Sequence, residues 1–314
     1  MTCKICGDSN EGKAHVVREM MLGLRDEFTY SECAGCGCLQ LIDIPENLAR
    51  YYPNDYYSYA NGRNVAAFVR NQRAAYARNG VNPIGGLMSY LYGPDAALDS
   101  IVRLKLNRQA RILDIGCGSG GLLRSLKRLG FHNLTGADPF LPKGIEANGV
   151  RLIKRQFFEL DDKFDVVMLH HTFEHMAEPQ FVLKEVKRVL HPDGVVILRM
   201  PVSDSYAWKH YGVNWHQLDA PRHLVIHTRK SMAMLAEEAG FSIFEAVYDS
   251  TLLQFIVSEQ YVRDISQADK RSYTNNPFRS IFSLDEIRSF RRRAGILNEK
   301  QQGDSACFYL RKEQ

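Results

Sequence analysis

The sequence predicts an α/β fold, a doubly wound Rossmann-like parallel sheet with a small cysteine-rich module at its N-terminal side. Two observations lead to this prediction. From residue 110 onward, short apolar strands alternate with helix-forming stretches, as in parallel sheets covered by helices. Ahead of them, five of the seven cysteines stand between residues 3 and 38. A chain of 314 residues, at roughly 150 residues per domain, therefore fits one large domain, a small module and helical insertions.

The N-terminal module contains two Cys-x2-Cys pairs, and a glycine follows each pair. Glycine allows the tight turn that brings two thiolates to one ion, and four thiolates suit a closed, structural zinc site. The predicted ligands are Cys3, Cys6, Cys33 and Cys36. Cys38 is a rival to Cys36 as the fourth ligand. Between the pairs, residues 13–20 and 22–30 read as the two strands of a β-hairpin, so the module resembles a zinc ribbon.

Composition limits the cellular setting and the partners. Cysteines gathered in one place indicate metal binding in a reducing compartment, whereas an extracellular disulfide framework would spread them along the chain. We find no apolar run of about 20 residues that would span a membrane, and no signal-peptide core at the N-terminus. We therefore expect a cytoplasmic protein without a membrane span. The 40 Lys and Arg nearly balance 36 Asp and Glu, so nucleic acid is not an expected partner.

A tyrosine-rich stretch, residues 51–59, closes a zinc-binding module expected over 1–60. Its aromatic rings suit either a lip over a substrate or packing of the module against its neighbour. Residues 61–108 read as a connector of amphipathic helices. The large domain is then predicted to span 109–314.

The large domain opens with a strand, a glycine loop and a helix. The apolar strand 110–115 leads into Gly116-Cys-Gly-Ser-Gly-Gly121, and 122–129 is helical. Glycines let the backbone approach a ligand, and the helix N-terminus presents free N–H groups to it. The loop alone also satisfies a dinucleotide pattern. Asp114, two residues before the first glycine, argues against that ligand, because a carboxylate repels a pyrophosphate and suits an ammonium group.

Two later strands end in polar residues. The strand 134–138 ends on Asp138, whose carboxylate can accept both hydroxyls of a ribose. The strand 164–169 is followed by His170-His-Thr-Phe-Glu-His175. Eight of the ten histidines lie between residues 170 and 227. Because ligands bind at the carboxyl ends of the strands in open α/β sheets, this part of the chain is expected to supply the pocket.

Together these segments resemble the class I S-adenosylmethionine-dependent methyltransferases. The matching segments, in order along the chain, are Leu113–Gly120, Gly136–Asp138, Phe164–Val167, His170–His175 and Leu190–Leu198. The N-terminal cysteines, the tyrosine-rich stretch and Ala220–Leu224 are similar to a narrower group. That group consists of bacterial methyltransferases with an N-terminal zinc module, often associated with sugar or surface-polysaccharide biosynthesis and including deoxysugar C-methyltransferases.

The resemblance implies a seven-stranded sheet whose last strand is antiparallel, with insertions over 202–227 and 251–304. It also implies S-adenosylmethionine as cofactor. The residues implied to bind it are Asp114, Gly116, Gly118, Gly120, Asp138, Phe157 and His170. In this assignment the glycines line the methionine part with Asp114 near its amino group, Asp138 holds the ribose, Phe157 flanks the adenine and His170 lies near the sulfonium.

A general base is needed where the acceptor is a hydroxyl or a carbon acid, and histidine suits neutral pH. We expect His171 in this role first, then His223, with His175 as a third candidate. The predicted acceptor is a small molecule, in particular a sugar nucleotide or glycan precursor, and oxygen, nitrogen and carbon acceptors stay open. Two alternatives are a nicotinamide-dependent Rossmann enzyme and a non-catalytic protein that binds S-adenosylmethionine.

Overall fold

The structure is a computed structural model, and it describes residues 2–52, 72, 82–84, 95–147, 149–277 and 280–313. The tyrosine-rich stretch beyond Tyr52 and most of the predicted connector 61–108 lie outside these residues. The chain forms two compact units. We call the first the cysteine unit, and it comprises Met1–Tyr52, Phe173–Leu183 and Met200–Phe308. We call the second the glycine-loop unit, and it comprises Pro53–Thr172, Lys184–Arg199 and Tyr309–Gln314. The predicted domain boundaries near residues 60 and 108 stay a prediction.

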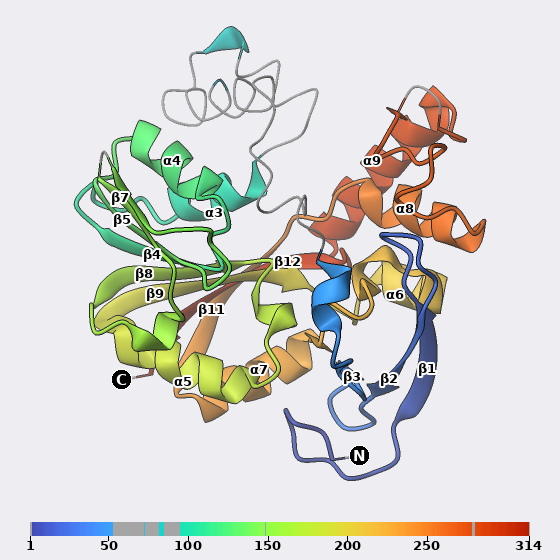
Figure 1. The fold of residues 1–314 in the computed structure, drawn as a ribbon, viewed down its shortest axis with the longest axis horizontal. Coiled ribbons are helices and arrows are strands. Elements are labelled where there is room, and N and C mark those ends of the chain that lie inside the picture. Colours follow the sequence, from blue (N-terminus) through green and yellow to red (C-terminus); the bar gives the residue numbers. More distant parts are fainter. Residues whose placement is uncertain are drawn as a thin grey trace. The chain divides into compact units, whose positions relative to one another are not determined.

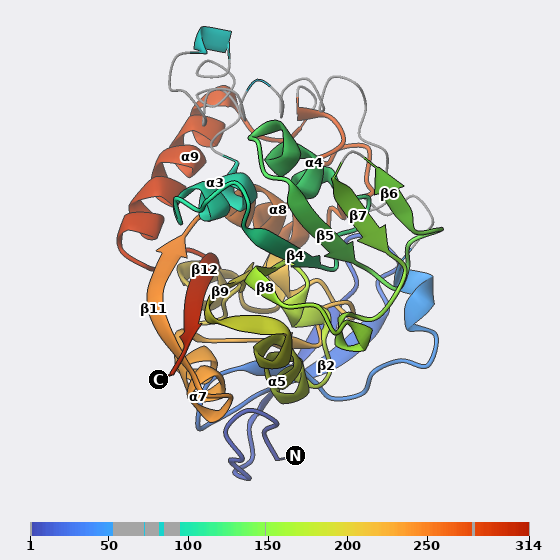
Figure 2. The ribbon, with the colours of Figure 1, turned by 90° about the vertical axis from the view of Figure 1, so that its left-hand side faces the viewer.

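The core of the glycine-loop unit is a parallel β-sheet. Its strands are β4 (Arg111–Ile115), β5 (Asn133–Ala137), β7 (Val150–Ile153), β8 (Phe164–His170) and β9 (Leu190–Pro201). Strand β4 pairs in parallel with β5 on one side and with β8 on the other, β5 pairs with β7, and β8 pairs with β9. Strands such as β8 are apolar because a parallel sheet is covered on both faces, and Val166 to Leu169 are fully buried. Figure 2 shows β4, β5 and β7 side by side.

Helix α4 (Gly121–Arg128) follows β4 and packs its buried residues Leu123 and Leu126 against the sheet. Helix α3 (Ala96–Val102) contacts α4. A short strand, β6 (Ile145–Ala147), pairs antiparallel with β7. The complete strand order is β11-β12-β9-β8-β4-β5-β7-β6, where β11 is Phe241–Tyr248 and β12 is Ser305–Lys312. The α/β fold class is confirmed, with β6 as an eighth strand at one edge of the expected sheet.

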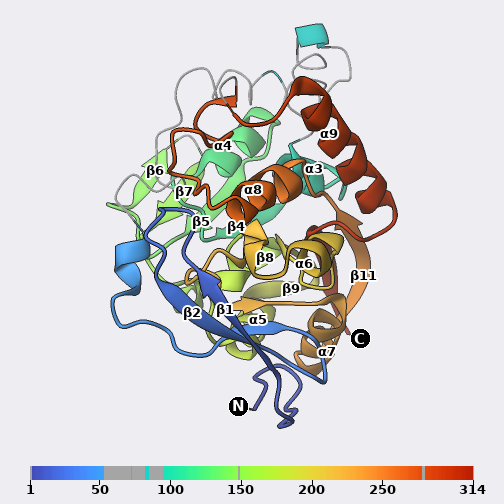
Figure 3. The ribbon, with the colours of Figure 1, turned by 90° about the vertical axis from the view of Figure 1, so that its right-hand side faces the viewer.

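The cysteine unit contains a second, four-stranded antiparallel sheet in the order β1-β2-β3-β10. The strands are β1 (Lys13–Arg18), β2 (Glu27–Glu32), β3 (Leu39–Leu41) and β10 (Val225–Ile226). The predicted hairpin is present, since β1 pairs with β2 over its whole length, but its second strand begins at Glu27 and not at residue 22. Figure 3 shows the two strands alongside each other. Strand β10 pairs with β3, so a segment far along the chain completes the sheet of the N-terminal module.

The cysteine unit also contains several helices. They are α6 (Tyr206–Tyr211), α7 (Arg229–Glu238), α8 (Leu253–Val262) and α9 (Leu284–Glu299), as labelled in Figure 1. Helix α5 (Pro179–Val189) precedes β9. Helices α7 and α9 begin with capping boxes at Thr228 and Ser283, which satisfy free N–H groups of the first turn. Among the described residues, no helix is both long enough and apolar enough to cross a membrane.

Candidate active site and metal centre

The glycine loop lies at the carboxyl end of β4, where the backbone needs conformations that favour glycine. Gly116 has a φ of +72°, and a Cβ atom there would lie 2.5 Å from the side chain of Thr172. Gly120 caps α4 with a φ of +76°. A side chain at either position would be strained, so the loop backbone stays open beside the N-terminus of α4. Helix N-termini of this kind bind anionic groups.

Two buried carboxylates flank this loop. Asp138 is held by two backbone N–H groups, because Gly118 donates to its Oδ2 at 3.0 Å and Phe140 donates to its Oδ1 at 2.9 Å. Asp114 is 4% exposed. Burial, and secondly the charge of Asp138, raises the pKa of Asp114 to about 8. Two like charges near each other in a buried site favour a cationic ligand, which lowers the cost of ionising both.

The other predicted cofactor residues also follow strand ends in the glycine-loop unit. Phe157 is buried in the 3-10 turn Phe157–Glu159, shortly after β7. His170 is the last residue of β8. Together with the glycine loop and Asp138, these residues lie at the carboxyl ends of the strands, which is where open α/β sheets bind ligands.

His171 directly follows β8 and has a φ of +49°, a strained conformation for a residue with a side chain. Its N–H donates to the carbonyl of Arg199 at 2.8 Å, and its Nε2 contacts the Arg199 guanidinium. Since a guanidinium can only donate hydrogen bonds, the lone pair of Nε2 is engaged. This geometry weighs against His171 as a proton acceptor.

His175 and His223 lie together in the cysteine unit, with 4.8 Å between their ring centroids. The Nδ1 of His175 lies 2.8 Å from the carbonyl oxygen of Arg222, and the Nδ1 of His223 lies 2.7 Å from that of Gln217. A carbonyl oxygen can only accept, so both Nδ1 atoms carry a proton. Burial, and secondly His175, lowers the pKa of His223 to about 4, so its ring is neutral at physiological pH.

Two carboxylates face the second nitrogen of His223. Glu174 Oε1 and Asp219 Oδ2 each lie 3.8 Å from His223 Nε2. Glu174, His175 and His223 have potential ligand atoms within 4.8 Å of one another, and these residue types can also bind a metal ion. If His223 Nε2 takes up a proton, the two carboxylates would stabilise the imidazolium that forms.

The four predicted metal ligands are brought together in the cysteine unit. Their sulfur atoms all lie within 4.8 Å of one another, with 3.7 Å between Cys3 and Cys36 and 3.5 Å between Cys6 and Cys33. An ion about 2.3 Å from each sulfur at tetrahedral angles would place them about 3.8 Å apart. The donor set therefore fits zinc.

Cys38 lies at one edge of this group. Its sulfur is 3.6 Å from that of Cys3 and 3.4 Å from that of Cys36. The side-chain N–H of Gln40 donates to the sulfur atoms of Cys3 and Cys38, at 3.1 and 3.3 Å. Gln40 thereby orients the predicted ligand Cys3 together with Cys38, the rival of Cys36. The sequence analysis did not identify Gln40.

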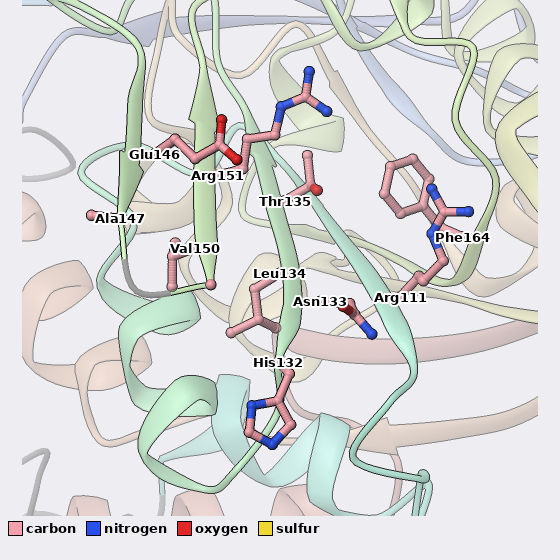
Figure 4. Close-up of a pocket in the computed structure, with 11 residues that line it drawn as sticks. Arg111, His132, Asn133, Leu134, Thr135, Glu146, Ala147, Val150, Arg151 and Phe164 are labelled. Carbon is pink, nitrogen blue, oxygen red and sulfur yellow. The ribbon is translucent and has the colours of Figure 1, made fainter.

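A cavity of about 500 Å³ opens at the amino ends of the strands of the parallel sheet (Figure 4). It is lined by the first residues of four strands, Arg111, Asn133, Val150 and Phe164. Arg111 and Arg151, at its rim, both pair with Asp162, at 2.9 and 3.4 Å. The cavity therefore lies at the amino ends of the strands and is separate from the predicted cofactor residues.

Comparison with known proteins supports the class indicated by this geometry. Residues 91–246, about half of the chain, match a family described as methyltransferase domain. The ubiquinone biosynthesis O-methyltransferase of Maricaulis maris is 32% identical over 119 residues, which are 33% of this chain and 46% of the relative. The enzyme of the same name from Azorhizobium caulinodans is 33% identical over 99 residues, which are 28% of this chain and 39% of the relative. The chain thus spans less than half the length of these relatives.

Among solved structures, the 1,6-didemethyltoxoflavin-N1-methyltransferase of Burkholderia thailandensis with bound S-adenosylhomocysteine has a TM-score of 0.45 and 16% identity, over 91% of this chain and 96% of that one. The family match, the strand order and the glycine loop show that the chain carries a class I S-adenosylmethionine-dependent methyltransferase domain. The predicted enzyme class is confirmed at the level of this domain.

Proposed function

We propose that the whole protein is an S-adenosylmethionine-dependent methyltransferase that acts on a small-molecule acceptor. The observation that carries the proposal is the pair of buried carboxylates, Asp114 and Asp138, at the ends of neighbouring strands around the glycine loop. Such a pair suits a ligand that combines an ammonium group with a ribose, and it disfavours the pyrophosphate of a nicotinamide cofactor.

The cofactor would supply a methyl group already activated on a sulfonium. Asp114 would hold the amino group, and Gly116, Gly118 and Gly120 would line the methionine part. Asp138 would accept the ribose hydroxyls, and Phe157 would flank the adenine. His170, at the end of β8, would lie near the sulfonium. Because the methyl group is already activated, holding the acceptor in line provides most of the remaining acceleration.

For the proton acceptor we place His223 ahead of His171. The Nδ1 proton of His223 is fixed by the carbonyl of Gln217, and Glu174 and Asp219 face its other nitrogen. A neutral imidazole oriented in this way can take a proton from a hydroxyl or carbon acid. His175, whose Nδ1 is fixed in the same manner, is the second candidate.

The acceptor we propose is a sugar nucleotide or glycan precursor. The support is the resemblance of the cysteine pairs and of Ala220–Leu224 to methyltransferases of sugar metabolism. A phenolic acceptor is the rival, since the curated relatives are named for ubiquinone biosynthesis. A screen of both acceptor classes with S-adenosylmethionine, read by mass spectrometry for a gain of one methyl group, tests this choice.

We also propose that Cys3, Cys6, Cys33 and Cys36 bind a structural zinc ion, because four sulfur ligands fill a tetrahedral site and leave no open position for substrate. A reducing, cytoplasmic setting fits these thiols.

Thermal shift with S-adenosylhomocysteine tests the central proposal. The expected result is stabilisation of the wild-type protein, reduced in Asp138→Asn, and no shift with NAD or NADP. Stabilisation by the nicotinamide cofactors alone would favour the other Rossmann chemistry. Binding without turnover on any acceptor would favour a non-catalytic role.

A further inference from the structure

The segment that contains His223 makes several hydrogen bonds to the N-terminal part of the cysteine unit. Directly after His223, strand β10 pairs with β3, and the N–H of Leu41 donates to the carbonyl of Leu224 at 2.9 Å. At the end of the segment, the Thr228 hydroxyl donates to the carbonyl of Cys36 at 2.7 Å. The segment from His223 to Thr228 is therefore an extension of the four-stranded sheet β1-β2-β3-β10.

A buried ion pair forms the first strong attachment. Arg222 and Glu19 are both fully buried, and the guanidinium donates to Glu19 Oε1 at 3.1 Å. The same guanidinium donates to Asp219 at 2.6 Å. Glu19 is held in turn by the N–H groups of Leu22 and Leu24, at 2.8 and 2.9 Å. The turn after β1 thus presents a fixed carboxylate to the residue next to His223.

A single hydrogen bond forms the second attachment. Tyr30, in β2, is fully buried, and its hydroxyl donates to the carbonyl oxygen of His223 itself at 2.7 Å. The ring of His223 is oriented by the carbonyl of Gln217, and that of His175 by the carbonyl of Arg222. Both rings therefore depend on where the backbone of residues 217–223 lies.

We propose that Glu19 and Tyr30 are positioning residues, which hold the backbone around His223 so that its Nε2 meets the acceptor. The N-terminal cysteine module would then be part of the catalytic apparatus and not a separate domain. This inference rests on the proposed function, in which His223 takes the proton. Glu19 and Tyr30 act only through Arg222 and the His223 backbone.

Tyr30→Phe is the sharpest test, because it removes one hydroxyl and keeps the ring. Tyr309→Phe is the matched control, since Tyr309 is also buried and its hydroxyl donates to a backbone carbonyl, that of Ser100, at 3.1 Å. Both variants lose one buried hydrogen bond of the same kind. A purely structural role for Tyr30 predicts the same behaviour in both.

The first readout needs no acceptor. Histidine NMR measures the pKa of His223 in the folded protein, which is about 4 because of burial and His175 and is opposed by Asp219 and Glu174. In Tyr30→Phe the loosened ring gains water, so its pKa should rise toward the ordinary value of 6.5. In Tyr309→Phe it should stay at about 4. An unchanged pKa in Tyr30→Phe would overturn the proposal.

The second readout is kinetic. Small displacements of a catalytic group cost up to about 100-fold in rate, so Tyr30→Phe should lower kcat by about 10- to 100-fold. The KM for S-adenosylmethionine should not change, because the proposed cofactor residues belong to the glycine-loop unit. Equal kcat values in Tyr30→Phe and Tyr309→Phe would count against positioning.

Glu19→Gln keeps the shape of the side chain and removes its charge. It should lower kcat at least as much as Tyr30→Phe does. If this variant does not fold, Tyr30→Phe decides the question alone. If His223→Gln keeps full activity, the proposed base is wrong, whereas the NMR comparison still tests whether the module holds the loop.

Discussion

The two units handle buried charge in opposite ways. In the glycine-loop unit, Asp114 and Asp138 are both buried, and the charge of Asp138 helps to raise the pKa of Asp114. In the cysteine unit, the buried Arg222 lies between Glu19 and Asp219, with which it pairs at 3.1 and 2.6 Å. The first site gains from a cationic ligand, whereas the second is neutralised by the protein's own side chains.

This difference separates binding from positioning. A site that holds like charges releases free energy when a cation arrives, which favours affinity for an ammonium group. A site whose charges are already paired is rigid before any ligand binds. We therefore expect changes in the glycine-loop unit to alter cofactor affinity, and changes in the cysteine unit to alter the rate or the stability.

The largest effect is expected from the metal site. Structural zinc contributes on the order of 10 kcal/mol to the folding of small domains, so Cys36→Ser or chelation should lower the melting temperature strongly and abolish methyl transfer. Binding of S-adenosylmethionine should persist, because the proposed cofactor residues lie in the other unit. Metal analysis and calorimetry measure both effects.

Cys38→Ser is the matched control for that variant, since Cys38 is a buried cysteine of the same group. It should keep one zinc ion per chain. If Cys38→Ser loses the metal and Cys36→Ser keeps it, Cys38 is the fourth ligand. Loss of cofactor binding on chelation would contradict the proposed independence of the two sites.

The second-largest effect is expected from loss of the proposed proton acceptor. His223→Gln should lower kcat by about 100- to 10,000-fold, while the KM for S-adenosylmethionine stays the same. In the wild type, kcat should fall as the pH drops through the pKa of His223 at about 4, because only the neutral ring accepts a proton. Steady-state kinetics across pH measures both effects. His132→Gln, at an exposed position of the glycine-loop unit, should change neither kcat nor its pH dependence.

A substitution in the proposed cofactor site should change the affinity for S-adenosylmethionine. Asp114→Asn should weaken binding of S-adenosylmethionine by about 1.5 to 3 kcal/mol, the range for a lost charged hydrogen bond. In the wild type, affinity should increase as the pH rises through about 8, because Asp114 ionises there. Calorimetric titration measures both. Methylthioadenosine, which lacks the amino acid part, is the control ligand, and an equal loss for it would refute the assigned contact to the ammonium group.

The two sites also differ in how far the sequence could predict them. Strand, loop and helix of the cofactor site are continuous between Arg111 and Arg128, so local patterns predicted the loop and Asp114 together. Asp138 was predicted in the same way, from its position at the end of the next strand. Periodicity and glycine placement are local signals, and they were sufficient to predict the strand, the loop and the helix, whereas the cofactor contacts stay a prediction.

The histidine site depends on contacts between distant parts of the chain. Glu19 and Arg222 are 203 positions apart, and no periodic pattern links them. The contact between His171 and Arg199, which weighs against His171 as the base, could not be predicted from the sequence, because it arises only when β9 pairs with β8. Arg222-His223 and Glu174-His175, each a charged residue beside a histidine, were the available signals. These two signals could be interpreted only once the contacts between distant segments of the chain were known.

The smallest expected effect has the opposite sign to the usual cost of altering a buried side chain. Because the folded-state pKa of Asp114 is raised from 3.8 to about 8, ionising this carboxyl destabilises the cofactor-free protein increasingly as the pH rises between these values. Asp114→Asn removes that penalty, so it should stabilise the cofactor-free protein on the order of 1 kcal/mol at pH 9, and less at pH 5. Urea unfolding at the two pH values measures the difference. Glu19→Gln should destabilise at both, since it leaves Arg222 with fewer carboxylate partners. If Asp114→Asn destabilises the protein at pH 9 as well, the two units do not differ in how they compensate buried charge.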